Sequence, residues 1–171
     1  RGAALAGARP VEVRPGFARA RLRVGPEHLN AVDVAQGGAV FTLADLAFAA
    51  ACNSHGTVAV AVNASISFVK AAGPGWLEAE AREVSLSPRL SSVTVHVRDR
   101  GGDLVAVFQG LAYRRKETLQ EVADSRPRAS DLAPRAGRAG SVATPEARGQ
   151  TPGRRRGATR DPAPGRRPAR R

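Results

Sequence analysis

The chain has 171 residues, a length that suits one domain, and it carries a formal net charge of +12. Hydrophobic residues make up 42% of it and aromatic residues only 4%, so its core must be built mainly from Ala, Val and Leu. A single cysteine excludes an internal disulfide, and no apolar run reaches the ~18 residues that a membrane-spanning helix needs.

The first predicted elements are two strands. Residues 11–13 lead into a Pro-Gly turn, and residues 17–24 then alternate apolar side chains with three arginines. That alternation predicts a half-buried strand with a basic outer face. A loop through residues 28–30 follows, and a Gln-Gly-Gly segment at residues 36–38 precedes the next element.

A long helix is predicted over residues 39–52, which read AVFTLADLAFAAAC. Ala, Leu and Phe dominate this stretch and it contains no Gly or Pro, which favours helix over strand. The Asn-Ser-His-Gly segment at residues 53–56 is typical of a helix end. Because the helix is apolar on nearly every side, we expect it to be buried on nearly every side.

Four further strands complete the predicted fold. Residues 57–69 alternate strongly, which places the side chains from Val58 to Phe68 at even positions on one face. Further strands are predicted at residues 76–84, 93–97 and 104–113. A Gly-Pro-Gly turn at residues 73–75 precedes the first of them, and a Gly-Gly pair at residues 101–102 precedes the last. We therefore predict an α+β fold in which an antiparallel sheet of five to six strands wraps around one long central helix.

The composition changes near residue 118. Thirteen arginines against five acidic residues lie between residues 121 and 171, in a stretch rich in Pro, Gly and Ala. Such a segment cannot bury enough apolar surface to offset the entropy of ordering. We expect a folded domain over residues 1–117 and a disordered basic tail over residues 118–171. The tail's arginines could bind nucleic acid non-specifically, but no aromatic residue interleaves with them for base stacking.

Asp45 does not fit its surroundings, because it lies in the middle of the most apolar segment. Burying an unpaired carboxylate costs several kcal/mol, and Asp45 is too far from the first turn to be stabilised by the helix dipole. No Lys or Arg lies within four positions of it. A remote ion pair and a catalytic carboxylate with a shifted pKa are both open explanations. Gly37 and Gly38, just before the helix, would allow an anion or an oxyanion to approach its N-terminus.

Several segments together resemble one enzyme family. Residues 10–116 are similar to the PaaI-type acyl-CoA thioesterases of the hotdog fold. The similar segments are HLN, QGGAVFTLADLAFAAACNSHG, ISFVKAAGPGWLEAEA and GGDLVAVFQGLAYRRK. The resemblance implies hydrolysis of an acyl-CoA, with an aryl group such as (hydroxy)phenylacetyl or a short to medium acyl chain, to free acid and CoA. It implies a role in phenylacetate degradation and a homodimer with shared active sites, either alone or paired into a dimer of dimers. We expect no metal or other cofactor.

The resemblance also assigns the catalytic residues. It implies that the Gly37 N–H is the oxyanion donor, that Asp45 is the catalytic carboxylate, acting either as base or as nucleophile, and that Asn30 and Gln36 position water or the carbonyl. The family usually has His where this chain has Gln36, and a glutamine cannot carry a proton between groups. Gly37 and Asp45 are eight residues apart, or about 12 Å along one helix. If both act on one thioester, they must come from different subunits.

The remaining assignments concern the substrate and the competing functions. Gly38, Arg89, Ser91 and Ser92 are the expected substrate-binding residues, with Arg89 near the CoA phosphates. A hotdog hydratase or dehydratase would need a catalytic His paired with an acid, and no His is placed for that. A non-catalytic acyl-CoA-binding protein and a nucleic-acid-binding protein are also compatible with the sequence. No secretory leader is recognisable, so we expect a cytoplasmic protein, and the absence of Met indicates a sequence trimmed at its N-terminus.

Overall fold

A computed structural model describes residues 2–125, and the greater part of the predicted tail, from residue 126 onward, lies outside the described residues. A short 3-10 turn covers Pro26–His28. The helices and strands follow one another as α1 (Gly2–Leu5), β1 (Arg9–Arg14), β2 (Phe17–Val24), α2 (Gly37–Asn53), β3 (Thr57–Phe68), β4 (Gly75–Leu86), β5 (Leu90–Asp99), β6 (Leu104–Thr118) and α3 (Leu119–Asp124).

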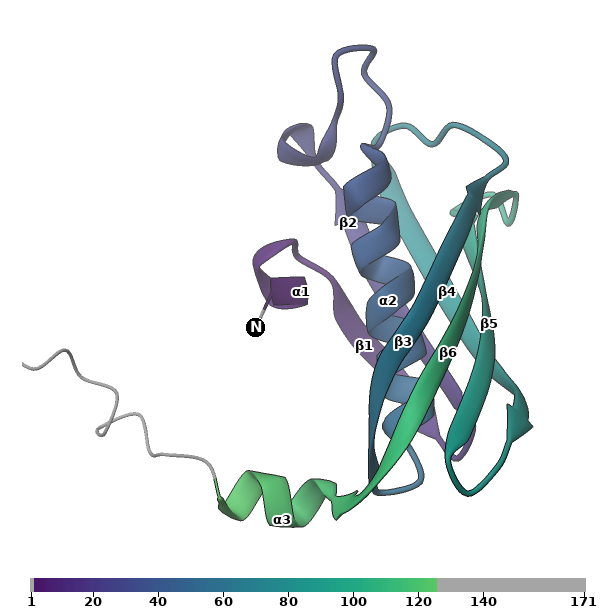
Figure 1. The fold of residues 1–171 in the computed structure, drawn as a ribbon. Coiled ribbons are helices and arrows are strands. Elements are labelled where there is room, and N and C mark those ends of the chain that lie inside the picture. The colour runs from purple at the N-terminus through teal and green to yellow at the C-terminus, as the bar shows by residue number, and fades with distance from the viewer. Residues whose placement is uncertain (1, 126–171) are drawn as a thin grey trace, which may run out of the picture. The chain divides into compact units, whose positions relative to one another are not determined.

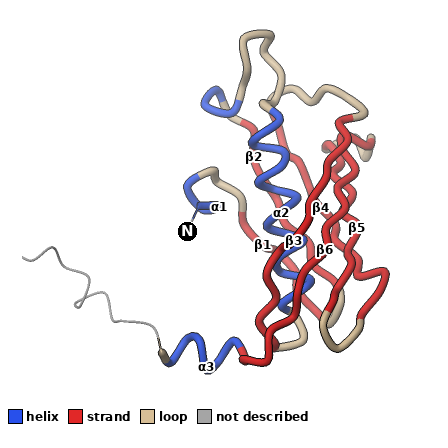
Figure 2. The backbone as a smooth tube through the Cα atoms, in the orientation of Figure 1, coloured by secondary structure: helices blue, strands red, loops and turns tan. Residues whose placement is uncertain are grey.

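The six strands form one antiparallel sheet in the order β1-β2-β4-β5-β6-β3, so β1 and β3 are its edges. The sheet curls, and α2 runs along its concave side (Figures 1 and 2). This arrangement confirms the predicted α+β fold with a sheet wrapped around one long helix. Among residues 2–125, none of the helices has the length and hydrophobicity needed to cross a membrane.

The core lies between α2 and the inner face of the sheet. Its largest fully buried side chains include Phe48 from the helix and Phe108 from β6, whose ring centroids are 5.5 Å apart in a tilted pair. Phe41 meets Phe108 edge-on at 5.4 Å. Most of the remaining core consists of Ala, Val and Leu, as the composition predicts. These small residues let the helix lie close to the sheet.

The outer face of β2 is basic, as predicted. Its arginines pair with glutamates at the matching register positions of β4: Arg19 contacts Glu80 at 2.9 Å and Arg21 contacts Glu78 at 2.7 Å. Phe17 precedes them on the same face and is nevertheless buried, because guanidinium groups lie over its ring. These pairs are partly exposed and contribute little stability each, so their main effect is to keep this half of the sheet polar.

Strand β3 departs from the sequence prediction. Its pairing with β6 shifts register between Ala61 and Asn63, which is a bulge that leaves one residue unpaired. As a result, Val60 lies beside the exposed Tyr113, whereas Ile66 lies beside the buried Phe108. Successive strand residues point to opposite faces, so the predicted single apolar face over the even positions is wrong.

The element boundaries also extend further than predicted. Helix α2 begins at Gly37, two residues before the predicted start, and β6 continues to Thr118 and leads directly into α3. Thr118 caps α3 by accepting a hydrogen bond from the Glu121 N–H, while the Glu121 carboxylate accepts one from the Thr118 N–H. Ordered structure therefore continues past residue 117, where the predicted domain ends.

We predict that Gly110→Ala destabilises the fold. A Cβ at position 110 would lie 2.5 Å from the Phe48 ring, which is itself buried against Phe108 and cannot move freely. The expected loss is about 1–3 kcal/mol in the free energy of unfolding, measured by denaturant titration. Gly73→Ala is the matched control, because a Cβ there would have no neighbour within 4 Å. Equal unfolding midpoints for the two variants would contradict this account of the helix–sheet contact.

Candidate active site

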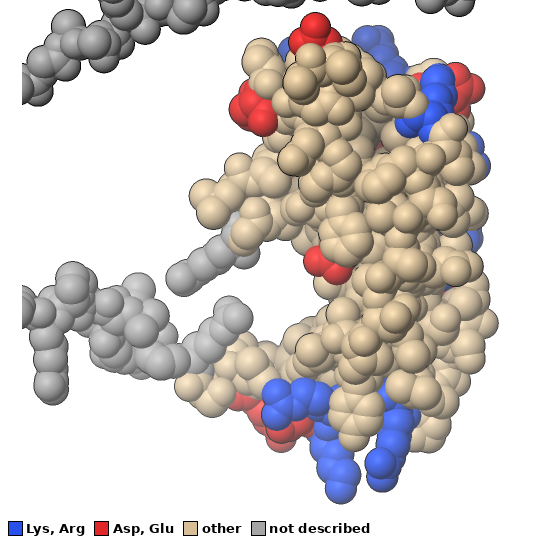
Figure 3. All heavy atoms as spheres, turned by 45° about the horizontal axis from the view of Figure 1, so that its top comes forward, with Lys and Arg blue, Asp and Glu red and all other residues tan. Residues whose placement is uncertain are grey.

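One stripe of α2 is not covered by the sheet. The buried helix residues face the sheet, whereas partly exposed positions recur about once per turn from Phe41 to Asn53. The stripe includes Asp45 and the apolar side chain of Leu46. Phe41 lies at its edge and is partly exposed, although its ring packs on Phe108. Figure 3 shows a face of the molecule with charged side chains gathered at two ends and a largely uncharged middle that holds an isolated acidic group.

Asp45 is a half-buried carboxyl group without a charged partner. Burial raises its pKa above the usual value for aspartate, and no hydrogen bond or opposite charge within residues 2–125 acts to lower it. The remote ion pair that the sequence left open is therefore not formed within these residues. A carboxyl whose pKa is raised by burial has the environment expected of a general base in an active site.

The N-terminus of α2 presents Gly37 beside an apolar hollow. Because Gly37 is the first helical residue, its N–H has no partner within the helix and is free to donate. The Phe68 ring lies against Gly37, and a Cβ at position 37 would be 3.1 Å from the ring edge. The hollow between them has a volume of about 370 Å³ and is lined by Val34, Ala35, Gly37, Val40, Phe68, Val69, Lys70, Ala71, Ala72 and Val105.

Gln36 and Gly38 lie on the other side of this helix end. Gln36 is the N-cap residue of α2, but its side chain does not cap the helix. The side-chain oxygen of Gln36 lies over Gly38. A Cβ at position 38 would be only 2.7 Å from this oxygen, so glycine leaves the space that the Gln36 amide occupies. The two residues border a hollow of about 390 Å³ whose other lining residues are Leu5, Ala6, Glu27, His28, Ala39 and Thr42.

Asn30 shapes the loop that leads to this helix end. Its side-chain oxygen accepts hydrogen bonds from the N–H groups of Val32 and Val34, at 3.0 and 3.3 Å. Within the same loop Asp33 adopts a left-handed conformation, with φ of 57°. The side-chain oxygen of Asn30 is thus occupied by hydrogen bonds from the backbone. The amide N–H groups of Asn30 are the part of the side chain that could reach a substrate.

The structure does not bring Gly37 and Asp45 of one chain together. Both residues belong to the same helix, and the eight-residue separation corresponds to about 12 Å along its axis. A thioester carbonyl held by the Gly37 N–H would therefore be out of reach of Asp45 in the same chain.

The three residues predicted to contact CoA occupy different environments. Arg89 is exposed in the turn between β4 and β5, and Ser92 is partly buried on the outer face of β5. Ser91 is fully buried and points inward, where its hydroxyl donates a hydrogen bond to Glu83, which also contacts His55 at 2.7 Å. Ser91 thus belongs to a buried polar cluster near the C-terminal end of α2 rather than to a surface open to a ligand.

Cys52 lies in the same buried cluster, 3.6 Å from the Ser91 hydroxyl. Burial raises the pKa of its thiol to about 11, so it stays protonated at neutral pH. A protonated, inaccessible thiol cannot act as a nucleophile, so Cys52 is a small core residue.

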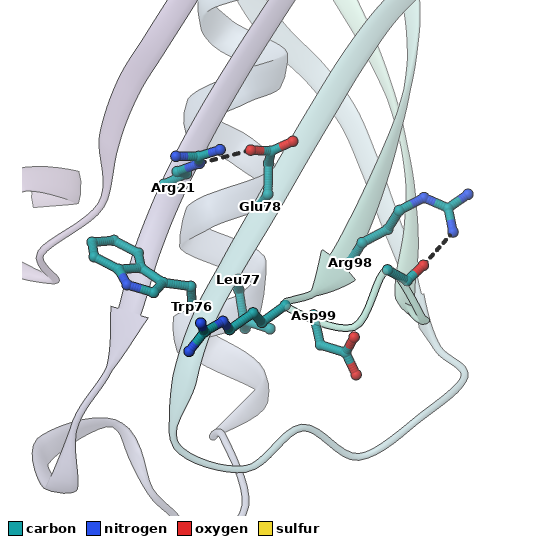
Figure 4. Close-up of a pocket in the computed structure, with 8 residues that line it drawn as sticks. Arg21, Trp76, Leu77, Glu78, Arg98 and Asp99 are labelled. Carbon is teal, nitrogen blue, oxygen red and sulfur yellow. Dashed lines mark hydrogen bonds and ion pairs between the residues drawn. The ribbon is translucent and has the colours of Figure 1, made fainter.

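A separate hollow of about 380 Å³ lies on the outer face of the sheet (Figure 4). It is lined by Arg21, Trp76, Leu77, Glu78, Arg98, Asp99, Arg100 and Gly102. Within it, Arg21 pairs with Glu78, and Arg98 donates to the carbonyl oxygen of Gly102. None of its lining residues borders the hollow beside Gly37, so it is not part of the site at the helix end.

Comparison with known proteins identifies the family of this chain. The profile of the thioesterase superfamily matches residues 34–106, which include Gly37, Asp45 and Phe68. A putative esterase from Archaeoglobus fulgidus is 44% identical over 66% of this chain and 74% of its own length. The acyl-coenzyme A thioesterase PaaI of Escherichia coli is 32% identical over 61% of this chain and 75% of its own length.

The solved structures show the same fold. The structure of E. coli PaaI, from the phenylacetic acid degradation operon, aligns with a TM-score of 0.66 and 31% identity, covering 68% of this chain and 86% of that one. The six-stranded sheet around one main helix is thus the hotdog fold of these neighbours. The chain belongs to the thioesterase superfamily, and it is a PaaI-type hotdog enzyme that hydrolyses acyl-CoA thioesters.

Proposed function

We propose that this protein hydrolyses acyl-CoA at sites shared between two subunits, each made of Gly37 from one subunit and Asp45 from the other. The observation that carries the proposal is Asp45: a half-buried carboxyl, without a charged partner in residues 2–125, on a helix stripe that the sheet leaves open. The substrates we propose are aryl-CoA thioesters such as phenylacetyl-CoA, or CoA thioesters of short to medium acyl chains.

Two exposed surfaces support a dimer. The stripe of α2 exposes apolar side chains beside Asp45, and a partner would shield them from water. Strand β3 is an edge of the sheet and exposes Val60 and Val62 to 50% and 60%. An unpaired edge with exposed valines is suited to pair with the same strand of a second chain. Such a pairing would bring two α2 helices side by side.

In the proposed mechanism, the Gly37 N–H binds the thioester carbonyl oxygen. Asp45 of the other subunit takes a proton from a water molecule, whose oxygen attacks the carbonyl carbon. Negative charge moves onto the carbonyl oxygen, where the Gly37 N–H and the positive end of the α2 dipole stabilise it. When the tetrahedral intermediate collapses, the C–S bond breaks, and CoA leaves as a thiolate that takes up the proton held by Asp45.

The residues around these two groups would position the reactants. The amide of Gln36 can donate and accept hydrogen bonds, and it would hold the water or the carbonyl without changing its own protonation state. The amide N–H groups of Asn30 could act similarly. Direct attack by Asp45 to form a mixed anhydride is the other route to the same products, and incorporation of labelled water oxygen into Asp45 during a single turnover would identify it.

We predict that Asp45→Asn lowers kcat by roughly 10²–10⁴-fold, because an amide cannot accept the proton from water. The fold should not suffer. Burial disfavours the charged form of Asp45, so the neutral amide should leave the free energy of unfolding at pH 7 equal or higher. Thioester hydrolysis and denaturant unfolding of the same preparation test both statements. An active variant, or an inactive one that is unfolded, would contradict the assignment.

We predict that activity falls on the acid side with an apparent pKa above the usual value for aspartate. Burial raises the pKa of Asp45, and only the ionised carboxylate can act as a base. The contribution of Asp45 to folding stability changes in the opposite direction with pH. The folded state holds the proton more tightly, so this group's contribution to stability is present below the unfolded pKa and is lost as pH rises through the folded pKa. The measurement is the pH profile of kcat/KM, with unfolding curves at the same pH values.

We predict that two variants, each inactive alone, restore activity when their subunits form mixed dimers. Gly37→Pro removes the proposed oxyanion donor at the first helical position, where proline is well tolerated, and Gln36 already has the extended backbone that a following proline requires. The proline Cβ would require a small shift of the Phe68 ring. In a mixed dimer with Asp45→Asn, one of the two sites keeps both groups.

Random assortment of the two variants should therefore recover about a quarter of the parental activity after co-expression or refolding together. Each variant alone, treated in the same way, is the control. If the mixture were no more active than its components, the two groups would not be shared between subunits.

A further inference from the structure

The hollow on the outer face of the sheet contains the only tryptophan of the chain (Figure 4). Trp76 is 38% exposed, and the Arg9 guanidinium group lies over its ring, 5.7 Å from the centroid. Arg23 of β2 is the strand partner of Trp76. An indole ring that is open to water offers a surface on which a planar ring of a ligand can stack.

Four arginines in or beside this hollow lack an acidic partner. They are exposed residues that form no ion pair with the described part of the chain: Arg9, Arg23, Arg98 and Arg100. Arg98 donates a hydrogen bond to the carbonyl oxygen of Gly102, which orients its guanidinium group without neutralising it. Guanidinium groups bind phosphates through pairs of parallel hydrogen bonds, so this cluster is suited to a ligand with several negative charges.

The two acidic residues that line the hollow are already paired. Glu78 contacts Arg19 and Arg21, at 3.3 and 2.7 Å. Asp99 contacts Lys70 at 2.9 Å. The charge that remains in the hollow is therefore positive, which favours an anion over a cation or a neutral molecule.

The hollow is also separate from the surfaces expected to bind acyl-CoA. None of its lining residues borders the hollow beside Gly37. Arg89, which we expect near the CoA phosphates, precedes β5, whereas Arg100 follows it. The ten residues of β5, at ~3.3 Å per residue, separate the two arginines by about 30 Å.

We propose that this outer hollow binds a nucleoside polyphosphate, with the base on Trp76 and the phosphates on Arg98 and Arg100. The inference does not rest on the proposed active site. The volume of about 380 Å³ is within the range of small-molecule sites, ~300–1,000 Å³. In Figure 4, Trp76 and Arg98 project to opposite sides of β4, so the ligand must be extended, as a base with a chain of phosphates is.

The first test is the fluorescence of Trp76 in the full chain, to which no other tryptophan contributes. We expect ATP to quench it saturably. Adenosine and inorganic triphosphate should each bind at least about tenfold more weakly than ATP, because each lacks one half of the ligand. If ATP caused no saturable quenching, or if triphosphate bound as tightly as ATP, the inference would be overturned.

The second test removes the arginines. Arg98→Gln and Arg100→Gln should each weaken ATP binding about fivefold or more, because each removes charged hydrogen bonds to phosphate. Arg115→Gln is the matched control: it removes the same charge from an exposed residue near the far end of β6, outside the hollow. Equal ATP affinities for the Arg100→Gln and Arg115→Gln variants would show that the phosphates are not bound in the hollow.

The third test removes the ring. Trp76→Leu also removes the fluorescence, so binding is measured by isothermal titration calorimetry. We expect the affinity for ATP to fall about fivefold or more and the affinity for triphosphate to stay the same. An unchanged affinity for ATP would rule out stacking on Trp76.

CoA provides the last comparison, because it carries an adenine ring and phosphates as well. If CoA quenched Trp76 and displaced ATP, the hollow would belong to the substrate site, and a separate nucleotide site would be ruled out. We expect ATP to remain bound at saturating CoA. None of these titrations measures hydrolysis, so a protein that binds ATP but hydrolyses no acyl-CoA would contradict the proposed function alone.

Discussion

The close packing of α2 against the sheet determines the rest of the structure. The inner face of the sheet is lined by small residues that are almost completely buried, among them Ala20, Ala79, Ala106 and Ala112. Together with Gly110, which touches the Phe48 ring, they allow the helix to approach closely. A curled sheet of this size covers one side of the helix and leaves a stripe on the other. The site is built on that stripe and on the N-terminal end of the helix.

A single helix thus carries both of the proposed functional groups, and its rigidity separates them. The free N–H of Gly37 is at the start of α2, and Asp45 is two turns further along. Since the helix cannot fold back on itself, assembly with a second copy is the way to bring the two groups to one carbonyl. The partly exposed apolar residues beside Asp45 and the exposed valines of the β3 edge would then stabilise the proposed dimer. In such a dimer, stability and activity would depend on the same interface.

The sequence predicted those parts of the fold that depend on local patterns. The alternation in residues 17–24 and the apolar run around Asp45 correspond to β2 and α2. The bulge in β3 was not predicted, because it arises from pairing with β6, and a simple alternation count places Val60 and Ile66 on one face. The burial of Ser91 was not predicted for a related reason: it depends on contacts with Glu83 and with Cys52 of α2 that are distant in sequence. The contact of Phe68 with Gly37 has no sequence signal either, since it joins the end of β3 to the start of α2.

The glutamine at position 36 affects how the proposed chemistry must work. A histidine there could share the transfer of protons with the carboxylate, whereas the Gln36 amide stays neutral at every working pH. The proton from water must then go to Asp45 and from there to the leaving thiolate. Burial raises the pKa of Asp45, which makes its carboxylate a stronger base than an exposed aspartate. The same burial works against the charged form of Asp45 in the folded protein. In the proposed mechanism, the raised pKa would let one carboxyl group serve as both base and acid, at the expense of folding stability.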